Sequence, residues 1–122
     1  MKPHLIDPTA RLRDIITRAL SGCAFERSER SDPAMLVLHA RRGDGRLVHL
    51  RFRGVKESSA SAEPEPGSPL AVKGVGSATP FWSRFLPVFL RTASQASRVR
   101  IEAGAARLEI VCEDAEWWED GA

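Results

Sequence analysis

The chain has 122 residues, a common length for one domain and too short for two independent hydrophobic cores. Apolar residues make up 43% and charged residues 28%, which is ordinary globular usage, so a wholly disordered chain is not expected. The formal net charge of +2 gives by itself no argument for a nucleic-acid or membrane partner. We therefore predict a single domain over residues 1–122.

We expect no targeting or membrane-spanning segment. The N-terminal stretch MKPHLIDPTARLRD lacks the apolar core of a signal peptide, and no run approaches the roughly 20 apolar residues that cross a bilayer. Cys23 and Cys112 stand beside apolar residues and in no CxxC or metal-ligand spacing, which is typical of buried core cysteines. These features predict a cytoplasmic protein with no membrane partner.

The first predicted element is an amphipathic helix over residues 8–21. Asp7-Pro8 is a start signal, because Asp accepts hydrogen bonds from free first-turn amides and proline there has none to lose. Gly22 favours a stop. The apolar residues at helical spacing are Leu12, Ile15, Ile16, Ala19, Leu20 and Cys23. A short strand over residues 23–28 and a turn at residues 31–33 are expected to follow.

Residues 35–55 predict a β-hairpin around Gly43-Asp44-Gly45. A two-residue turn at Asp44-Gly45 would mix apolar and charged side chains on each face. A three-residue loop instead gives one apolar face, and it places Gly45 where a left-handed backbone is needed. The apolar pairs are then Leu36 with Phe52, Leu38 with Leu50, and Ala40 with Val48.

Residues 56–69, reading KESSASAEPEPGSP, predict a flexible loop that separates two halves of the sheet. A short strand is expected at residues 70–75. The segment 79–96 then opens with Thr79-Pro80 and carries aromatic residues at helical spacing, but Pro87 interrupts it. This pattern predicts either one kinked helix or two helical pieces, whose aromatic residues either fill the core or form an exposed partner-binding surface.

A second hairpin is predicted over residues 98–113, with Gly104-Ala105 as a two-residue turn. Two apolar and two opposite-charge pairs select the same register. They are Ile101 with Leu108, Val99 with Ile110, Glu102 with Arg107, and Arg100 with Glu109. The expected fold is therefore α+β, an antiparallel sheet built mainly from the two hairpins, with the N-terminal helix packed on its apolar face.

Two groups of residues are candidate binding surfaces. The aromatic group suits a protein interface, where Trp is enriched among the residues that carry binding energy. It consists of Trp82, Phe85, Phe89, Trp117 and Trp118, of which the adjacent tryptophans would point to opposite faces of a strand. The basic group lies on the outer face of the first hairpin, where guanidinium groups could contact phosphates. It consists of His39, Arg41, His49, Arg51 and Arg53.

The sequence gives only weak evidence for a metal site, a catalytic cysteine or a phosphate-binding loop. His39 and His49 would face each other closely enough to share a metal, but zinc needs further ligands and the neighbouring arginines repel a cation. The cysteines lie on apolar stripes rather than in an electropositive, partly exposed site. Gly74-Val75-Gly76 lacks the rest of a phosphate-binding or dinucleotide motif. We therefore assign no catalytic residue, metal or cofactor.

These observations favour a small cytoplasmic, non-enzymatic domain that binds another protein or self-associates, as a homodimer for example. The first alternative is nucleic-acid binding through the arginine-rich hairpin face. The second is a small-ligand-binding domain or enzyme with a pocket under the aromatic segment 81–90. The partner and oligomeric state are left open by the sequence.

Overall fold

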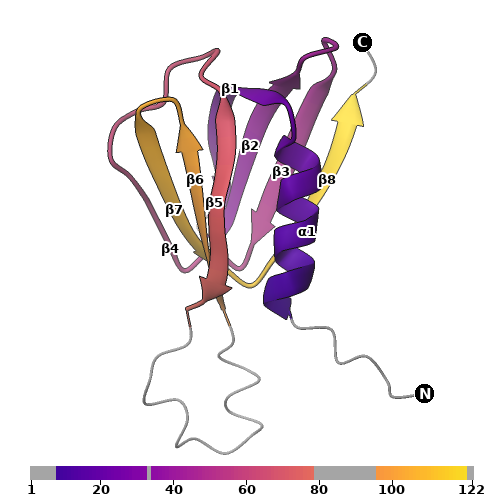
Figure 1. Cartoon of the computed structure of the whole chain (residues 1–122). Helices are drawn as coiled ribbons and strands as arrows, with labels where there is room; N and C mark the ends of the chain where they lie inside the picture. The colour runs from indigo at the N-terminus through magenta and orange to yellow at the C-terminus, as the bar shows by residue number, and fades with distance from the viewer. Residues whose placement is uncertain (1–7, 33, 79–95, 121–122) are drawn as a thin grey trace, which may run out of the picture.

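The computed structural model describes residues 8–32, 34–78 and 96–120 (Figure 1). Within them the chain forms one helix, α1 (Pro8–Leu20), followed by eight strands. The strands are β1 (Cys23–Asp32), β2 (Met35–Arg42), β3 (Leu47–Arg53), β4 (Glu57–Ala60), β5 (Leu70–Ser77), β6 (Ser97–Ala103), β7 (Ala106–Cys112) and β8 (Asp114–Asp120). No helix of the described part of the chain is long and apolar enough to cross a membrane.

The strands form two antiparallel four-stranded sheets, ordered β1-β2-β3-β8 in the first sheet and β4-β7-β6-β5 in the second. The predicted α+β class is confirmed. Each predicted hairpin lies in its own sheet, β2 with β3 and β6 with β7. The chain crosses between the sheets directly after β3 and again after β7. Backbone hydrogen bonds from Lys56 N to Val111 O (2.8 Å) and from Glu113 N to Arg53 O (3.0 Å) join the two crossings.

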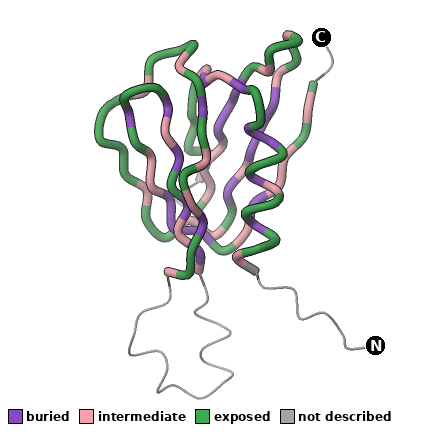
Figure 2. The backbone as a smooth tube through the Cα atoms, in the orientation of Figure 1, coloured by how far each residue is buried: buried purple, intermediate pink, exposed green. Residues whose placement is uncertain are grey.

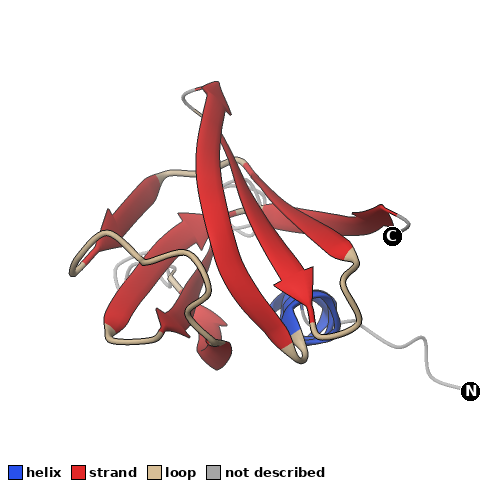
Figure 3. Ribbon diagram, turned by 90° about the horizontal axis from the view of Figure 1, so that it is seen from above, coloured by secondary structure: helices blue, strands red, loops and turns tan. Residues whose placement is uncertain are grey.

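Helix α1 lies beside the edge strands β5 and β8 and covers the open side between the two sheets (Figures 1 and 3). Its predicted apolar stripe is buried except for Ile15, which is partly buried. Arg13 Nη2 donates to Val75 O of β5 at 2.9 Å. Buried residues alternate with more exposed ones along β6, whereas β2 and β3 each bury three consecutive residues because His39 and His49 are buried as well. The core lies between the sheets and the helix (Figure 2). The largest fully buried side chains are Phe52, Ile16, Leu20, Leu38, Leu50, Ile101 and Ile110.

Both predicted hairpin registers are confirmed residue by residue. In the first hairpin, Arg42 N donates to Arg46 O at 2.8 Å, which closes the three-residue loop, and Gly45 has the predicted positive φ of 94°. In the second hairpin, Gly104 has a φ of 61° and the following Ala105 has no positive φ, which is the pattern of a type II′ turn.

Several boundaries differ from the sequence-based prediction. Residues Glu57–Ala60, expected within a loop, pair with β7 as the edge strand β4. An edge strand needs backbone hydrogen bonds on one side only, so its polar, Ser-rich sequence does not prevent pairing. Strand β1 continues to Asp32, with irregular pairing at residues 25–27 and 30–32 that periodicity alone did not indicate. The helical prediction for residues 79–96 lies outside the described residues, except at Ala96.

Candidate functional site

The basic hairpin group and Trp118 lie together on the outer surface of the first sheet, because side chains alternate between the two faces of each strand. We call this surface the Trp118 face. Its outward-facing charged and aromatic residues are Glu26, Arg27, Glu29, His39, Arg41, His49, Arg51, Arg53, Asp114, Glu116, Trp118 and Asp120. The central strands β2 and β3 thus supply cations, while the flanking strands β1 and β8 supply most of the carboxylates.

Each arginine of the basic group is paired with a carboxylate. Arg41 Nε lies 2.7 Å from Glu26 Oε1, and Arg53 Nη2 lies 2.9 Å from Asp114 Oδ2. Arg51 pairs with Glu116, which is directly opposite on β8. The group is therefore charge-compensated, and a phosphate chain approaching its arginines would meet the paired carboxylates as well.

His39 and His49 form the centre of a polar row that crosses the whole first sheet. Their Nδ1 atoms lie 2.6 Å apart, and the two side chains belong to residues that are only 8% and 9% exposed. His49 Nε2 lies 2.6 Å from Asp120 Oδ2, and His39 Nε2 lies 3.3 Å from Glu29 Oε2. The row Glu29, His39, His49 and Asp120 therefore takes one titratable side chain from each of the four strands.

Trp118 is the exposed large apolar residue of this face. It is 40% exposed, and its ring stacks on His49 with centroids 5.3 Å apart and planes inclined by 28°. The Arg51 guanidinium carbon lies 5.3 Å from the Trp118 ring centroid, within the range of a cation–π contact. The ring is thus fixed between a histidine and an arginine, with part of its apolar surface open to solvent.

The structure describes one further member of the aromatic group, Trp117. Trp117 points to the opposite side of β8, as predicted for adjacent residues of a strand, and packs half-buried against the core. Trp82, Phe85 and Phe89 lie outside the described residues, and so does the segment 81–90 beneath which a ligand pocket was expected. Of the two tryptophans that the structure describes, it therefore places Trp118 with the basic group and Trp117 on the opposite side of β8.

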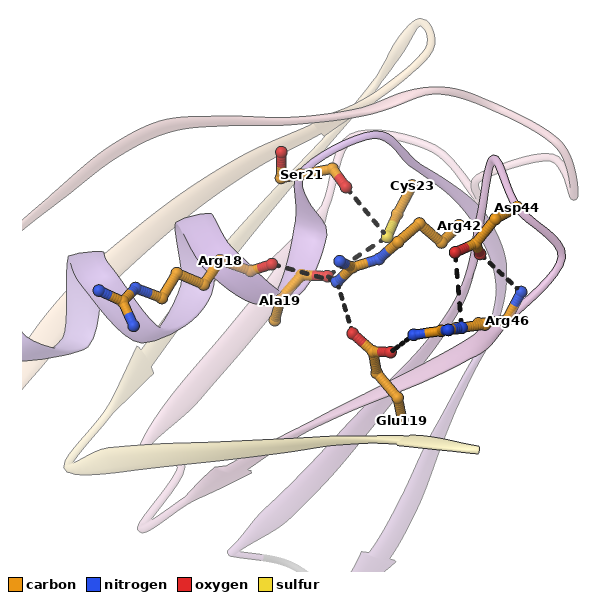
Figure 4. A network of polar contacts seen from close by, with 8 residues as sticks. All are labelled: Arg18, Ala19, Ser21, Cys23, Arg42, Asp44, Arg46 and Glu119. Carbon is orange, nitrogen blue, oxygen red and sulfur yellow. Dashed lines mark hydrogen bonds and ion pairs between the residues drawn. The ribbon is translucent and has the colours of Figure 1, made fainter. Parts of the chain in front are cut away.

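Sequence reasoning missed Arg42, an inward-facing residue of β2 that links this strand to the end of α1 and to β8. Its Nη2 donates to the carbonyls of Arg18 and Ala19 at the end of α1, both at 3.2 Å, and lies 3.2 Å from Glu119 Oε1 of β8 (Figure 4). Helices leave their last carbonyls without partners, so this cation caps α1 and interacts favourably with its dipole. The signal in the sequence was an arginine at an inward-facing position of a strand.

The two cysteines are poor nucleophiles in this fold. Burial raises the pKa of the Cys23 thiol, although the nearby Arg42 opposes that shift. Burial, together with Asp114 and Glu113, raises the pKa of the Cys112 thiol to about 12. Reactive cysteines instead need a lowered pKa and access to solvent. Both thiols therefore behave as packing groups, not as reaction centres.

The described residues give little evidence for a metal or ligand site. No group of three or more His, Cys, Asp or Glu side chains in the described ranges could hold a metal ion. A hollow of 480 Å³ lies on the outer face of the second sheet. Its charged lining carries both signs, from Lys73, Arg100, Arg107, Glu102 and Glu109, and it shows no preference for one class of ligand.

Comparison with known proteins adds no assignment: no protein-family model, no curated protein and no solved structure matches this chain. The functional argument therefore depends on the geometry of the Trp118 face.

Proposed function

We propose that this chain is a non-enzymatic binding domain that self-associates through the Trp118 face. The observation that carries this proposal is the partly exposed Trp118 ring, fixed between His49 and Arg51. Trp and Arg dominate the energetics of protein interfaces, and a side chain that is already ordered loses less entropy on binding. Trp118 therefore has the properties of an interface anchor.

The charge pattern favours a second copy of the chain as the partner. Cations on β3 lie beside carboxylates on β8, with Arg51 opposite Glu116 and Arg53 opposite Asp114. Most homodimers have a two-fold axis. If that axis runs along the strands between β3 and β8, Arg51 and Arg53 of one copy lie over Glu116 and Asp114 of the other. The same operation brings each Trp118 over the partner's His49, so both apolar and charged groups are matched.

Two observations weigh against the alternative functions. Nucleic acid would have to compete with the carboxylates that already pair with Arg41, Arg51 and Arg53. Acid–base catalysis by a histidine needs one of its ring nitrogens within reach of the substrate. The ring nitrogens of His39 and His49 are directed at each other and at two carboxylates instead.

We also place the domain in the cytoplasm, where the two free thiols, Cys23 and Cys112, suit a reducing compartment.

The test is solution mass by light scattering over a concentration series, at low and high salt. We expect a dimer that weakens at high salt, because exposed ion pairs across an interface are screened. Trp118→Ala should give a folded monomer, with a melting temperature lowered by the loss of the ring contacts with His49 and Arg51 and of the stabilisation by association. Arg53→Glu should also weaken the dimer, because it places a second carboxylate opposite Asp114. The matched control is Arg100→Glu on the outer face of the second sheet, which should leave the dimer intact.

A wild-type chain that stays monomeric at about 1 mM, where even a weak interface is occupied, would refute self-association. The nucleic-acid alternative would gain support if the monomer were retained on DNA or RNA in a salt-dependent way. That retention should then be lost in a variant carrying both Arg51→Ala and Arg53→Ala.

A further inference from the structure

The contact between His39 and His49 accommodates only one proton. In an Nδ1 to Nδ1 hydrogen bond one ring donates and the other accepts, so one of the two nitrogens carries no hydrogen. The outer nitrogens face carboxylate oxygens, of Glu29 on one side and Asp120 on the other, and both can donate to them. All contacts of the row are satisfied when the pair holds three ring protons on its four nitrogens.

A fourth proton changes this arrangement. Both Nδ1 atoms would then be donors, and two N–H groups cannot remain 2.6 Å apart. Both rings would also carry a positive charge at close range in a largely buried position, where the repulsion is weakly screened. The rings must therefore separate. His49 is the ring on which Trp118 stacks, so separation alters the support of the interface anchor.

Charged side chains from every strand of the first sheet surround the pair. The carboxylates Glu29 and Asp120 stabilise positive charge on the rings, and Glu29 is itself paired with Arg27. Arg51, which also contacts the Trp118 ring, forms an ion pair with Glu116, and Arg41 forms one with Glu26. Because Arg27 already offsets Glu29, the two nearest carboxylates leave one negative charge to balance the rings. No third carboxylate contacts the rings to offset the second charge within the described residues.

We propose that the contact between His39 and His49 is a pH switch for the Trp118 face. With one proton shared between the two Nδ1 atoms, the rings support Trp118. Acidification adds a second proton at this contact, which is the fourth on the pair, and the rings separate. Its effect on association depends on the self-association proposed above. The separation of the two rings within one chain does not depend on self-association. By proton linkage, one proton per chain changes the association constant of a dimer by up to about a hundredfold per pH unit.

The first experiment is ¹⁵N NMR of the histidine side chains at about pH 7.5 and about pH 4.5, which bracket the ordinary titration of imidazole. A His4→Gln variant removes the third histidine from the spectra. At neutral pH we expect one protonated and one unprotonated Nδ1, coupled across the hydrogen bond. At acid pH we expect both Nδ1 atoms protonated and the coupling lost. Two uncoupled Nδ1 atoms at neutral pH would overturn the proposal.

The second experiment measures dimer dissociation by light scattering over the same pH range. His39→Asn is the key variant, because its amide can occupy the position of Nδ1 and bond His49 but does not titrate. We expect the wild-type dimer to dissociate on acidification and the His39→Asn dimer to respond much less. A dimer equally pH-sensitive in both proteins would refute the link to the Trp118 face. If the wild type is monomeric throughout, the proposed function fails, and the NMR result alone decides the switch.

Discussion

Arg42 offers the sharpest test of how the fold is held together. Its guanidinium donates to two carbonyls at the end of α1, pairs with Glu119, and lies 5.7 Å from the Trp117 ring centroid. The side chain is 27% exposed. Arg42→Ala therefore removes a cap, an ion pair and a packing contact together, and the affected groups are partly shielded from water.

The expected loss of unfolding free energy in Arg42→Ala follows from these contacts. A hydrogen bond to a charged group contributes about 1.5–3 kcal/mol, and a cation at a helix end contributes up to about 2 kcal/mol when partly buried. These contributions overlap, and water can reach part of the site, so we expect Arg42→Ala to lower the free energy of unfolding by about 2–3 kcal/mol. For a domain of this size that corresponds to a fall in melting temperature of about 6–12 °C.

The assay is urea unfolding followed by tryptophan fluorescence, with Arg41→Ala as the matched control. Arg41 is the preceding residue on β2, but it points outward, where its pair with Glu26 and its hydrogen bond to the Gly45 carbonyl (2.9 Å) are exposed. Exposed pairs of this kind contribute less than about 1 kcal/mol. Arg42→Lys keeps the charge without the planar fork and should give an intermediate loss. If Arg42→Ala and Arg41→Ala destabilise the chain equally, the capping argument is refuted.

Two further predictions concern the first hairpin loop and the buried thiol. Gly45→Ala should destabilise the chain by about 1–2 kcal/mol because Gly45 has a φ of 94°, and Gly43→Ala in the same loop, without a positive φ, should be nearly neutral in the same urea titration. The raised pKa of Cys112, about 12 against the ordinary 9.0, means that the folded state keeps its proton after the unfolded state has lost it. Stability should therefore be intact below about pH 9 and fall by up to about 1.4 kcal/mol per pH unit above it. Cys112→Ala should remove that component, and an unchanged alkaline slope in this variant would contradict the assignment.

Local sequence determined the helix and both hairpins. The apolar stripe of α1 repeats at the helical period, and Gly22, with a φ of 67°, ends it. In each hairpin, a glycine at the turn and the alternation of side chains select one register, because a shift by one residue would turn every apolar side chain to solvent. These signals act between near neighbours in the chain, so no knowledge of the rest of the fold was needed.

The tertiary structure decided how the hairpins are arranged and where the candidate site lies. Nothing local to β3 or β7 indicates that the chain crosses to a second sheet, or that β8 returns beside β3. That return places Trp118 and Asp120 against His49, more than 60 residues away in the chain. Arg42 likewise gains its role only when the end of α1 and Glu119 reach it. Pairing between distant strands depends on the global burial of apolar surface, and neither periodicity nor turn chemistry encodes that choice.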